Sequence, residues 1–428
     1  MSQVDNFPAQ WGMRRLRFDA QLNPLKSRLD LPADTEVSFV PMDAVGELGG
    51  LALNGTRPIE EVYNGYTYFA DGDIVIAKIT PCFENGKGAL AEGLTNGVAF
   101  GTTELHVVRP QPGIDARFLF YLTIAHDFRA FGEAEMLGAG GQKRVPEEFL
   151  KDWRAPLPPL ETQQRIARFL DEKTARIDRL IEKKRALLDR LDEQRQALIT
   201  RAVTKGLNPD ARMKPSGIDW LGDIPTHWEV KRLDRLNDYL RPIRYGIVLP
   251  GPHVPGGVPI IKGGDVRPER LKRELLNCTA PEIDAANPNA RIAAGDLVYT
   301  IRGSFGDVEI ATEELAGCNL TQDTARISPL TSVDAQWLLM ALKSSVVRGN
   351  LAAGSLGATI KGINIFDLRR ALLPLPPFDE QKAIAAYLAA RRSNLDDLAS
   401  TIRVSIERLA EYRAALITAA VTGKLEIA

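Results

Sequence analysis

The sequence has few cysteines and no long hydrophobic run. Three cysteines occur among 428 residues, at Cys82, Cys278 and Cys318. Their odd number and wide separation argue against a disulfide framework or a CxxC metal site, so we expect small buried side chains. No stretch approaches 18 consecutive apolar residues, so no membrane span is predicted. The first residues, MSQVDNFPAQWGMRRLRF, lack an apolar signal core, which predicts a cytoplasmic protein.

Neither sign of charge is in excess. The chain carries 54 Lys and Arg against 55 Asp and Glu, a formal net charge of −1. This balance gives no direct indication of nucleic-acid binding, so a DNA-binding face would have to gather its basic groups locally. A chain of 428 residues is too long for one hydrophobic core, so two or more domains are expected.

Catalytic and cofactor-binding motifs are also missing. Asn-Pro occurs at Asn23, Asn208 and Asn287, but none continues as the Pro-aromatic pair of an NPPY-like loop that holds a flipped adenine. The sequence has no Gly-rich nucleotide fingerprint and no GxxxxGK[ST] loop, and its four histidines are isolated. We therefore predict a chain that is not catalytic by itself and holds no metal and no cofactor.

What the sequence does contain is an internal repeat. Residues 156–207 and 374–425 align without a gap and are identical at 23 of 52 positions. Both segments open with PLPP and close with ALITxAVTxxL. Such a repeat indicates two half-molecules in tandem with pseudo-twofold symmetry, which suits a partner that is itself two-ended.

Each repeat predicts a long helix. The opening prolines cannot lie inside a helix, and no further Pro or Gly follows until Gly206 and Gly423, so each helix can run for about 40 residues. An apolar stripe with a spacing of seven is typical of a coiled coil, although Lys184 interrupts it. We expect the two helices to pair antiparallel within the chain, with an oligomerisation arm as the alternative. The predicted coiled-coil core is Leu170, Ile177, Leu191, Leu198, Leu388, Leu395, Ile402, Leu409 and Leu416.

The two remaining segments share one order of features. FPAQWGMRRLRF, from Phe7, is similar to IPTHWEVKRLDR, from Ile224, and GDIVIAKI, from Gly72, is similar to GDLVYTIR, from Gly295. Short β-rich segments broken by Gly and Pro are followed by one helix, near 116–131 and 334–348. The predicted fold class is α+β, with two pseudo-symmetric α+β domains joined by two long helices forming an antiparallel coiled coil. The predicted division is 1–155, 156–207, 208–373 and 374–428.

The motif PLPPxxxQxxIAxxL, followed by a long helix that closes in LITxAVTxxL, resembles the specificity subunit of a type I restriction–modification enzyme. Residues 216–233, SGIDWLGDIPTHWEVKRL, resemble the stretch that opens the second recognition half in that family. The resemblance implies two target-recognition domains that each read one half of a bipartite, asymmetric site in double-stranded DNA. It also implies that the coiled coil sets the half-site spacing and docks two methyltransferase subunits, which restriction/translocase subunits join. S-adenosylmethionine, ATP and Mg are then expected in those partner subunits.

Two Gly-rich segments, GAGGQKR at 138–144 and GSLGATIKG at 354–362, occupy corresponding places before the proline linkers. Flexible glycines beside polar and cationic side chains can approach phosphates or base edges, although ordinary exposed loops would look the same. The DNA-binding candidates are Lys78, Thr80, Lys87, Gln142, Lys143, Arg144, Lys262, Arg267, Arg302, Ser304 and Lys361. A coiled-coil scaffold without a DNA role and a self-contained methyltransferase or nuclease are the alternative classes.

Overall fold

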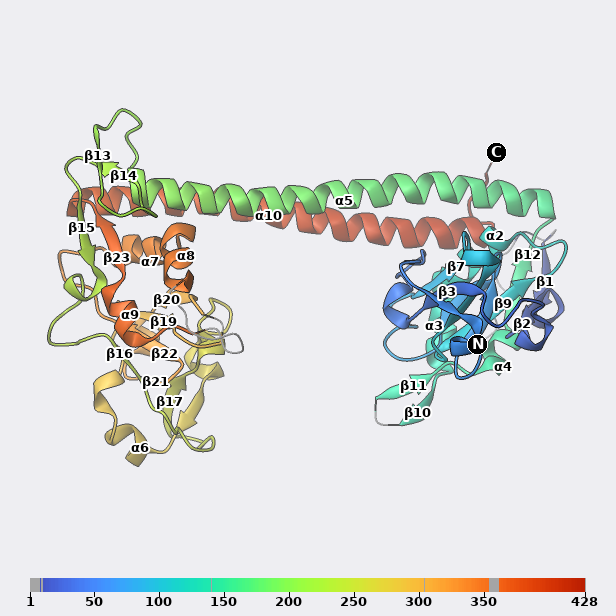
Figure 1. The fold of residues 1–428 in the computed structure, drawn as a ribbon, viewed down its shortest axis with the longest axis horizontal. Coiled ribbons are helices and arrows are strands. Elements are labelled where there is room, and N and C mark those ends of the chain that lie inside the picture. The colour runs from blue at the N-terminus through green and yellow to red at the C-terminus, as the bar shows by residue number, and fades with distance from the viewer. Residues whose placement is uncertain (1–7, 9–10, 140, 304, 354–361, 428) are drawn as a thin grey trace. The chain divides into compact units, whose positions relative to one another are not determined.

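The chain forms two compact units. The computed structural model describes residues 8, 11–139, 141–303, 305–353 and 362–427. Unit 1 consists of residues 1–185 and 403–428, and unit 2 consists of residues 186–402. Each unit therefore combines one α+β domain with a segment of both long helices (Figure 1). The four-segment division made from the sequence remains a prediction.

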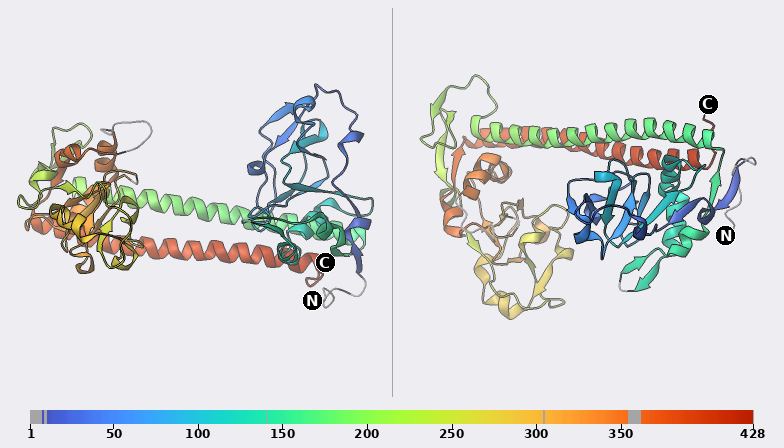
Figure 2. Two further views of the ribbon diagram at one scale, coloured as in Figure 1. Left: turned by 90° about the horizontal axis from the view of Figure 1, so that it is seen from below. Right: turned by 45° about the vertical axis from the view of Figure 1, so that its right-hand side comes forward.

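Unit 1 is built on two four-stranded sheets (Figure 2). The first is antiparallel throughout, in the order β2 (Ala20–Leu22), β9 (Leu105–Pro110), β6 (Ile74–Ala77), β7 (Gly88–Leu90). The second has the order β4 (Thr56–Pro58), β3 (Glu36–Val40), β8 (Val98–Gly101), β5 (Thr67–Ala70), in which only β3 and β8 run parallel. Alternate side chains of β6 face two different apolar clusters. Ile74 and Ile76 belong to one, and Val75 belongs to the other together with Phe69 and Ala99 of the second sheet.

Unit 2 repeats much of this topology, but its mixed sheet has three strands. Its antiparallel sheet has the order β16 (Arg244–Tyr245), β22 (Thr324–Ile327), β19 (Leu297–Thr300), β20 (Val308–Ile310). Its mixed sheet has the order β18 (Asn277–Thr279), β17 (Val258–Ile261), β21 (Asn319–Leu320), in which β17 and β21 run parallel. The two halves share a fold plan although their sequences have diverged outside the long helices.

Short paired strands complete each unit. The entry strands predicted beside Trp11 and Trp228 are β1 (Gly12–Arg15) and β15 (Glu229–Arg232). Each pairs antiparallel with the strand that leads into a long helix, β12 (Arg154–Leu157) or β23 (Leu372–Leu375). Two hairpins, β10 (Leu137–Ala139) with β11 (Gln142–Arg144) and β13 (Met213–Pro215) with β14 (Asp223–Pro225), project from the domains.

The single helix predicted in each domain is wrong, because two helices meet there at a break. They are α2 (Ala116–Ile124) and α3 (His126–Ala134) in unit 1, and α7 (Ala335–Lys343) and α8 (Ser345–Ala353) in unit 2. The residue at each break, Ala125 or Ser344, has an extended backbone with ψ near 148° or 140°. Neither residue is Pro or Gly, so no local signal in the sequence marks the break. The shorter helices are α1 (Ile59–Val62), α4 (Glu147–Asp152), α6 (Pro281–Ala285) and α9 (Ile365–Arg370).

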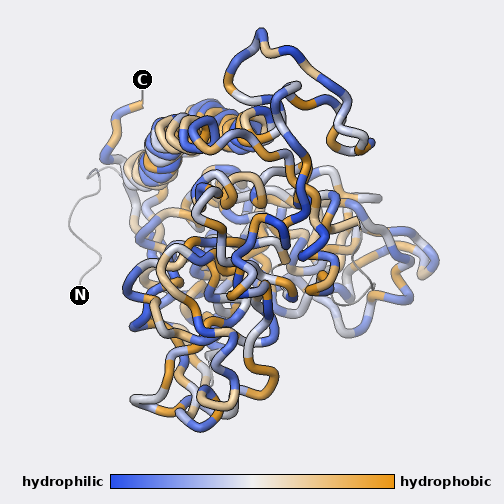
Figure 3. The backbone as a smooth tube through the Cα atoms, turned by 90° about the vertical axis from the view of Figure 1, so that its left-hand side faces the viewer, coloured by the Kyte–Doolittle hydropathy of each residue, from blue (hydrophilic) through white to orange (hydrophobic). Residues whose placement is uncertain are grey.

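The two long helices are α5 (Leu160–Lys205) and α10 (Phe378–Val421). α5 is followed directly by Gly206, with φ 76°, and α10 ends two residues before Gly423, with φ 70°. Glycines with a left-handed backbone are common at helix C-termini. In unit 1 the first turns of α5 share a core with the last turns of α10, and in unit 2 the last turns of α5 share one with the first turns of α10. The predicted antiparallel pairing is therefore confirmed. Figure 3, which looks down the long helices, shows both hydrophilic and hydrophobic residues in them.

Burial divides the predicted coiled-coil core into two groups. Five of its residues are buried: Leu170, Ile177, Leu191, Leu388 and Ile402. Four are half-buried: Leu198, Leu395, Leu409 and Leu416. The buried positions are the ones on which packing stability depends most. Among the described residues, no helix is both long and apolar enough to cross a membrane.

Candidate nucleic-acid interface

In unit 1, the loop after β6 joins the β10–β11 hairpin. The Thr80 N–H donates to the Lys143 carbonyl at 3.0 Å, and the Val145 N–H donates to the Lys78 carbonyl at 2.8 Å. Ile79 and Arg144 form an isolated antiparallel β-bridge. These bonds gather five predicted residues into one cluster, which we call the unit 1 hairpin cluster: Lys78, Thr80, Gln142, Lys143 and Arg144.

The hairpin presents two side chains to solvent. Gln142 and Lys143 are both exposed, and no described residue pairs with the Lys143 ammonium group. A Cβ atom at Gly138 would lie 2.4 Å from the Gln142 carbonyl oxygen, so only glycine lets the two strands of the hairpin approach this closely. The sequence therefore builds a tight hairpin that carries an amide and a cation, groups that bind base edges and phosphates.

Arg144 is held by a carboxylate. Its Nε and Nη2 atoms donate to the two Glu104 oxygens at 2.9 and 2.8 Å in a bidentate pair. This hydrogen bond from Arg144 holds the pKa of the Glu104 carboxyl below its ordinary value. Arg144 therefore positions the hairpin on the sheet, and Lys143 is the freer cation of the cluster.

A buried histidine supports the hairpin from below. His106 Nε2 lies 2.8 Å from the Val145 carbonyl oxygen. Burial lowers the pKa of His106, and nearby Lys78 acts in the same direction. The neutral ring therefore donates its Nε2 proton to the Val145 carbonyl and ties the hairpin to β9.

Lys87 does not join this cluster. Its Nζ donates to the Met42 carbonyl at 3.0 Å, and its backbone forms an isolated bridge with Glu47. The half-buried side chain is thus used inside the domain. The sequence did not separate Lys87 from its neighbours because a loop lysine looks the same whether it points inward or outward.

Unit 2 builds the same junction from different residues. Arg302 and Gly362 form the isolated antiparallel bridge that corresponds to Ile79 and Arg144 in unit 1. A Cβ atom at Gly263 would lie 3.2 Å from the Arg302 carbonyl oxygen, so the turn that begins at Lys262 lies against Arg302. Arg267 is held elsewhere, 3.8 Å from an Asp307 carboxylate oxygen. The predicted residues Ser304 and Lys361 lie outside the described residues.

A hollow of about 670 Å³ opens beside Arg302. Tyr245, Val248 and Gln322 line it, together with Gly362. Tyr245, on the edge strand β16, and Val248, in the loop that follows, are both exposed. Our sequence reasoning missed Tyr245 and Gln322. The only signal was a polar TQD triplet just before a buried strand, at the place that TTE holds in unit 1.

The glutamine of the repeated motif fixes each domain to its long helix. In unit 1, Gln163 Oε1 accepts from the Asp115 N–H at 2.9 Å, and Gln163 Nε2 donates to the Pro158 carbonyl at 2.8 Å. The Asp115 carboxylate in turn caps α2 by accepting from the Phe118 N–H. Gln381 makes the same bonds in unit 2, to the Asp334 N–H at 2.8 Å and the Pro376 carbonyl at 2.9 Å.

Within the described ranges, no group of three or more His, Cys, Asp or Glu side chains is arranged to hold a metal ion. The exposed features of both junctions are amide, hydroxyl, aromatic and cationic groups. Such groups can hydrogen-bond to phosphates and to base edges.

Comparison with known proteins identifies the family. The family model described as the type I restriction modification DNA specificity domain matches residues 28–190 and 253–408. Each matched segment runs from an α+β domain into a long helix, so the match repeats as the fold does.

Three curated relatives are similar in sequence. The specificity subunits of the type I restriction enzymes EcoAI and EcoEI, both from Escherichia coli, are 43% and 40% identical over 162 residues, which are 37% of this chain and 27% of each relative. The chain thus aligns with about a quarter of their length. The putative type I restriction enzyme MjaX specificity subunit from Methanocaldococcus jannaschii is 27% identical over 367 residues, 83% of this chain and 79% of that protein.

Two solved structures share the fold. A chain from work on complex assembly and conformational transition of the type I R-M system has a TM-score of 0.75 at 20% identity, covering 99% of this chain and 100% of that chain. The HsdS subunit from Thermoanaerobacter tengcongensis has a TM-score of 0.54 at 20% identity with the same coverage. Because the family model spans most of both halves, this chain belongs to the type I restriction modification DNA specificity domain family.

Proposed function

We propose that this chain is the DNA-recognition subunit of a type I restriction–modification complex and that it binds a bipartite, asymmetric site in double-stranded DNA. The observation that carries the proposal is the duplicated junction. The Ile79–Arg144 bridge in unit 1 and the Arg302–Gly362 bridge in unit 2 put polar and cationic groups at the same place in two copies of one fold. Two like surfaces with different side chains suit two different DNA half-sites.

The two junctions offer different reading groups. Unit 1 presents the Gln142 amide and the Lys143 ammonium group on a hairpin. Unit 2 presents Arg302, Tyr245 and Gln322 around a hollow. A glutamine amide hydrogen-bonds well to adenine and an arginine to guanine, and an aromatic ring stacks on bases. The two parts of the DNA site should therefore differ in sequence.

The long helices offer surface to partner subunits. Leu180, Val404 and Tyr412 are exposed in unit 1, with exposed fractions between 42% and 58%. Leu187 and Leu398 are exposed in unit 2, at 43% and 46%. Apolar side chains exposed along a paired helix suit helices of other chains. We assign this surface to two copies of a methyltransferase subunit, which restriction/translocase subunits join.

We assign the catalytic reactions to those partner subunits. Methyl transfer from S-adenosylmethionine and ATP- and Mg-dependent cleavage are assigned to the other subunits, and this chain supplies recognition alone. The competing proposal, a scaffold without DNA contact, gives no reason for two tight junctions with different exposed polar groups.

The test is methylome sequencing of a host that carries this chain with its neighbouring methyltransferase gene. The proposal predicts one methylated motif with two short specified parts and an unspecified middle. A host without this chain is the control and should lack the motif. If the same methylated motif persists after this chain is deleted, the proposal is contradicted.

A further inference from the structure

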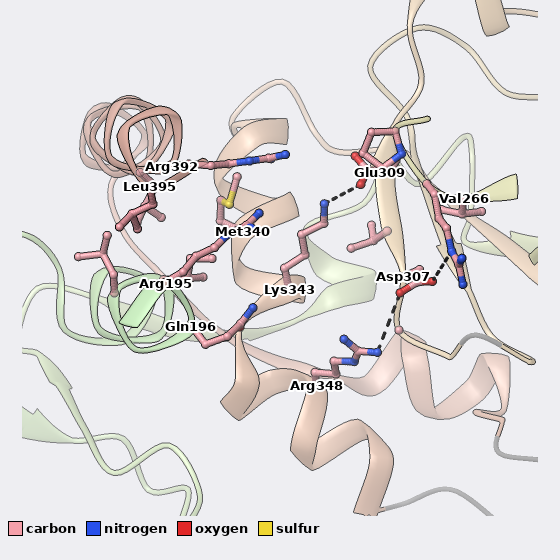
Figure 4. A pocket seen from close by; sticks show the side chains of 17 residues that line it. Arg195, Gln196, Val266, Asp307, Glu309, Met340, Lys343, Arg348, Arg392 and Leu395 are labelled. Carbon is pink, nitrogen blue, oxygen red and sulfur yellow. Dashed lines mark hydrogen bonds and ion pairs between the residues drawn. The ribbon is translucent and has the colours of Figure 1, made fainter. Parts of the chain in front are cut away.

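Unit 2 contains a cationic pocket that the proposed function does not use. Its volume is about 360 Å³, within the range of small-molecule sites. Residues of α5, α10, α7, α8 and the turn after β17 line it (Figure 4). All of them belong to unit 2.

Apolar and charged side chains together line the pocket. Leu198, Leu388, Leu395 and Met340 supply the apolar wall. The charged lining consists of the cations Arg195, Arg267, Lys343, Arg348 and Arg392 and the anions Asp307 and Glu309. Asp396 pairs with Arg195 and Arg392 from outside the lining, at 3.5 and 3.3 Å. Even with Asp396 counted, cations exceed anions by two.

The ion pairs inside the pocket leave donors unused. The Lys343 ammonium group lies 2.7 Å from a Glu309 carboxylate oxygen. The Asp307 carboxylate has two longer contacts, 3.8 Å to Arg267 and 4.0 Å to Arg348. Arg195 has one long ion-pair contact, 3.5 Å from Nη1 to Asp396, and its side chain is 32% exposed. A partly exposed guanidinium group with one long contact can still donate to oxygen atoms of a ligand.

In unit 1 the corresponding region contains Leu48, a residue of the domain's own loop. Arg413, which corresponds to Arg195 in the repeat, donates to the Leu48 carbonyl at 3.3 Å. The Leu48 side chain lies against Gly86, since a Cβ atom at Gly86 would be 2.8 Å from it. In unit 2 the Arg348 side chain lies against the matching Gly306, since a Cβ atom there would be 2.8 Å from Arg348 Nε, and both residues line the pocket. A cationic side chain in the unit 2 pocket thus stands where unit 1 keeps the apolar Leu48.

From these observations we infer that the unit 2 pocket binds a small phosphate ester with an apolar or aromatic body, of the size of a nucleotide. The guanidinium groups of Arg195 and Arg392 suit phosphate oxygens, and the leucine and methionine side chains of the lining suit an apolar body. Free nucleotide and the DNA backbone share this phosphate chemistry. We commit to the free ligand because the pocket has the volume of a small-molecule site.

The test uses the full-length chain and isothermal titration calorimetry with AMP, ATP, pyrophosphate and adenosine. We expect AMP and ATP to bind and adenosine to bind at least 10-fold more weakly. Arg392→Gln should weaken ATP binding at least 10-fold, because it removes a lining cation. Gln196→Trp should do the same by filling the space while leaving every cation in place.

Arg391→Gln is the matched control, since Arg391 is an exposed arginine one position away that does not line the pocket. It should bind ATP within twofold of the parent, and all variants should keep the parent circular dichroism spectrum and melting temperature. No binding of any phosphate probe, equal binding of adenosine, or equal weakening by Arg391→Gln would overturn the inference. Displacement of ATP by a short duplex of arbitrary sequence would assign the pocket to the DNA backbone and also overturn it.

Discussion

Arg413 and Asp178 form an ion pair between α10 and α5 in unit 1, with Arg413 Nε 2.9 Å from Asp178 Oδ1. The same two positions of the repeat, Arg195 and Asp396, pair in unit 2 at 3.5 Å. Each arginine thus bonds the aspartate of the other copy of the repeat. The reciprocal arrangement is what pseudo-twofold symmetry requires of two antiparallel helices, and it fixes their register in both units.

The two pairs should differ in strength. Arg413 is 9% exposed and also donates to the Leu48 carbonyl, whereas Arg195 and Asp396 are 32% and 50% exposed. We expect Arg413→Ala to destabilise the chain by about 1–3 kcal/mol and Arg195→Ala by less than about 1 kcal/mol. Urea unfolding of the two variants measures this difference. If both variants lose the same free energy of unfolding, burial does not decide the strength of these ion pairs.

Gln163 should hold domain and helix together in unit 1. It is 2% exposed and bonds two backbone groups, the Asp115 N–H and the Pro158 carbonyl. Gln163→Ala leaves both unpaired, so we expect a loss of about 1–3 kcal/mol in the free energy of unfolding. The exposed neighbour in Gln164→Ala is the matched control and should change it by less than about 0.5 kcal/mol. A large effect of the control alone would refute the assignment.

Lys143 and Gln142 should separate affinity from reading. Lys143→Ala is expected to weaken binding on every duplex and to reduce the slope of log K against log salt by about 0.9, the value for one phosphate contact. Gln142→Ala is expected to relax one base position, worth about 1–3 kcal/mol. Binding to cognate and singly substituted duplexes at two salt concentrations tests both. If the Gln142 variant loses affinity equally on all duplexes, Gln142 does not read a base.

The β10–β11 hairpin should loosen at acid pH. The bond from Arg144 lowers the pKa of Glu104, and burial lowers that of His106 below its ordinary 6.5. A group whose folded pKa is lowered adds stability above its unfolded pKa and loses it as pH falls through the folded value. Protection of the Val145 and Thr80 N–H groups from hydrogen exchange should therefore fall as pH drops below about 6.5.

The matched variant for this prediction is His106→Gln, which cannot titrate. Its protection should not fall as pH drops through the range where His106 titrates in the parent, and should decline only where Glu104 titrates. Identical pH profiles for the parent and this variant would show that His106 does not couple the hairpin to pH.

The sequence predicted the long helices well and the junctions poorly, for physical reasons. Dense prolines and two capping glycines mark both ends of α5 and α10, and the seven-residue spacing needs no tertiary information. The breaks at Ala125 and Ser344 arise where two helices pack on the domain, and no local signal marks them. Lys87, Tyr245 and Gln322 show the same limit, since whether a loop side chain points inward depends on contacts far away in the chain.

Domain exchange with readout of the methylated motif tests the central claim most directly. Residues 1–155 are replaced by the corresponding domain of another member of the family, and the chain is expressed with its methyltransferase subunit. The account predicts that one specified part of the motif changes while the other part is retained. A change in both parts, or in neither, would contradict the claim that each unit reads one half-site.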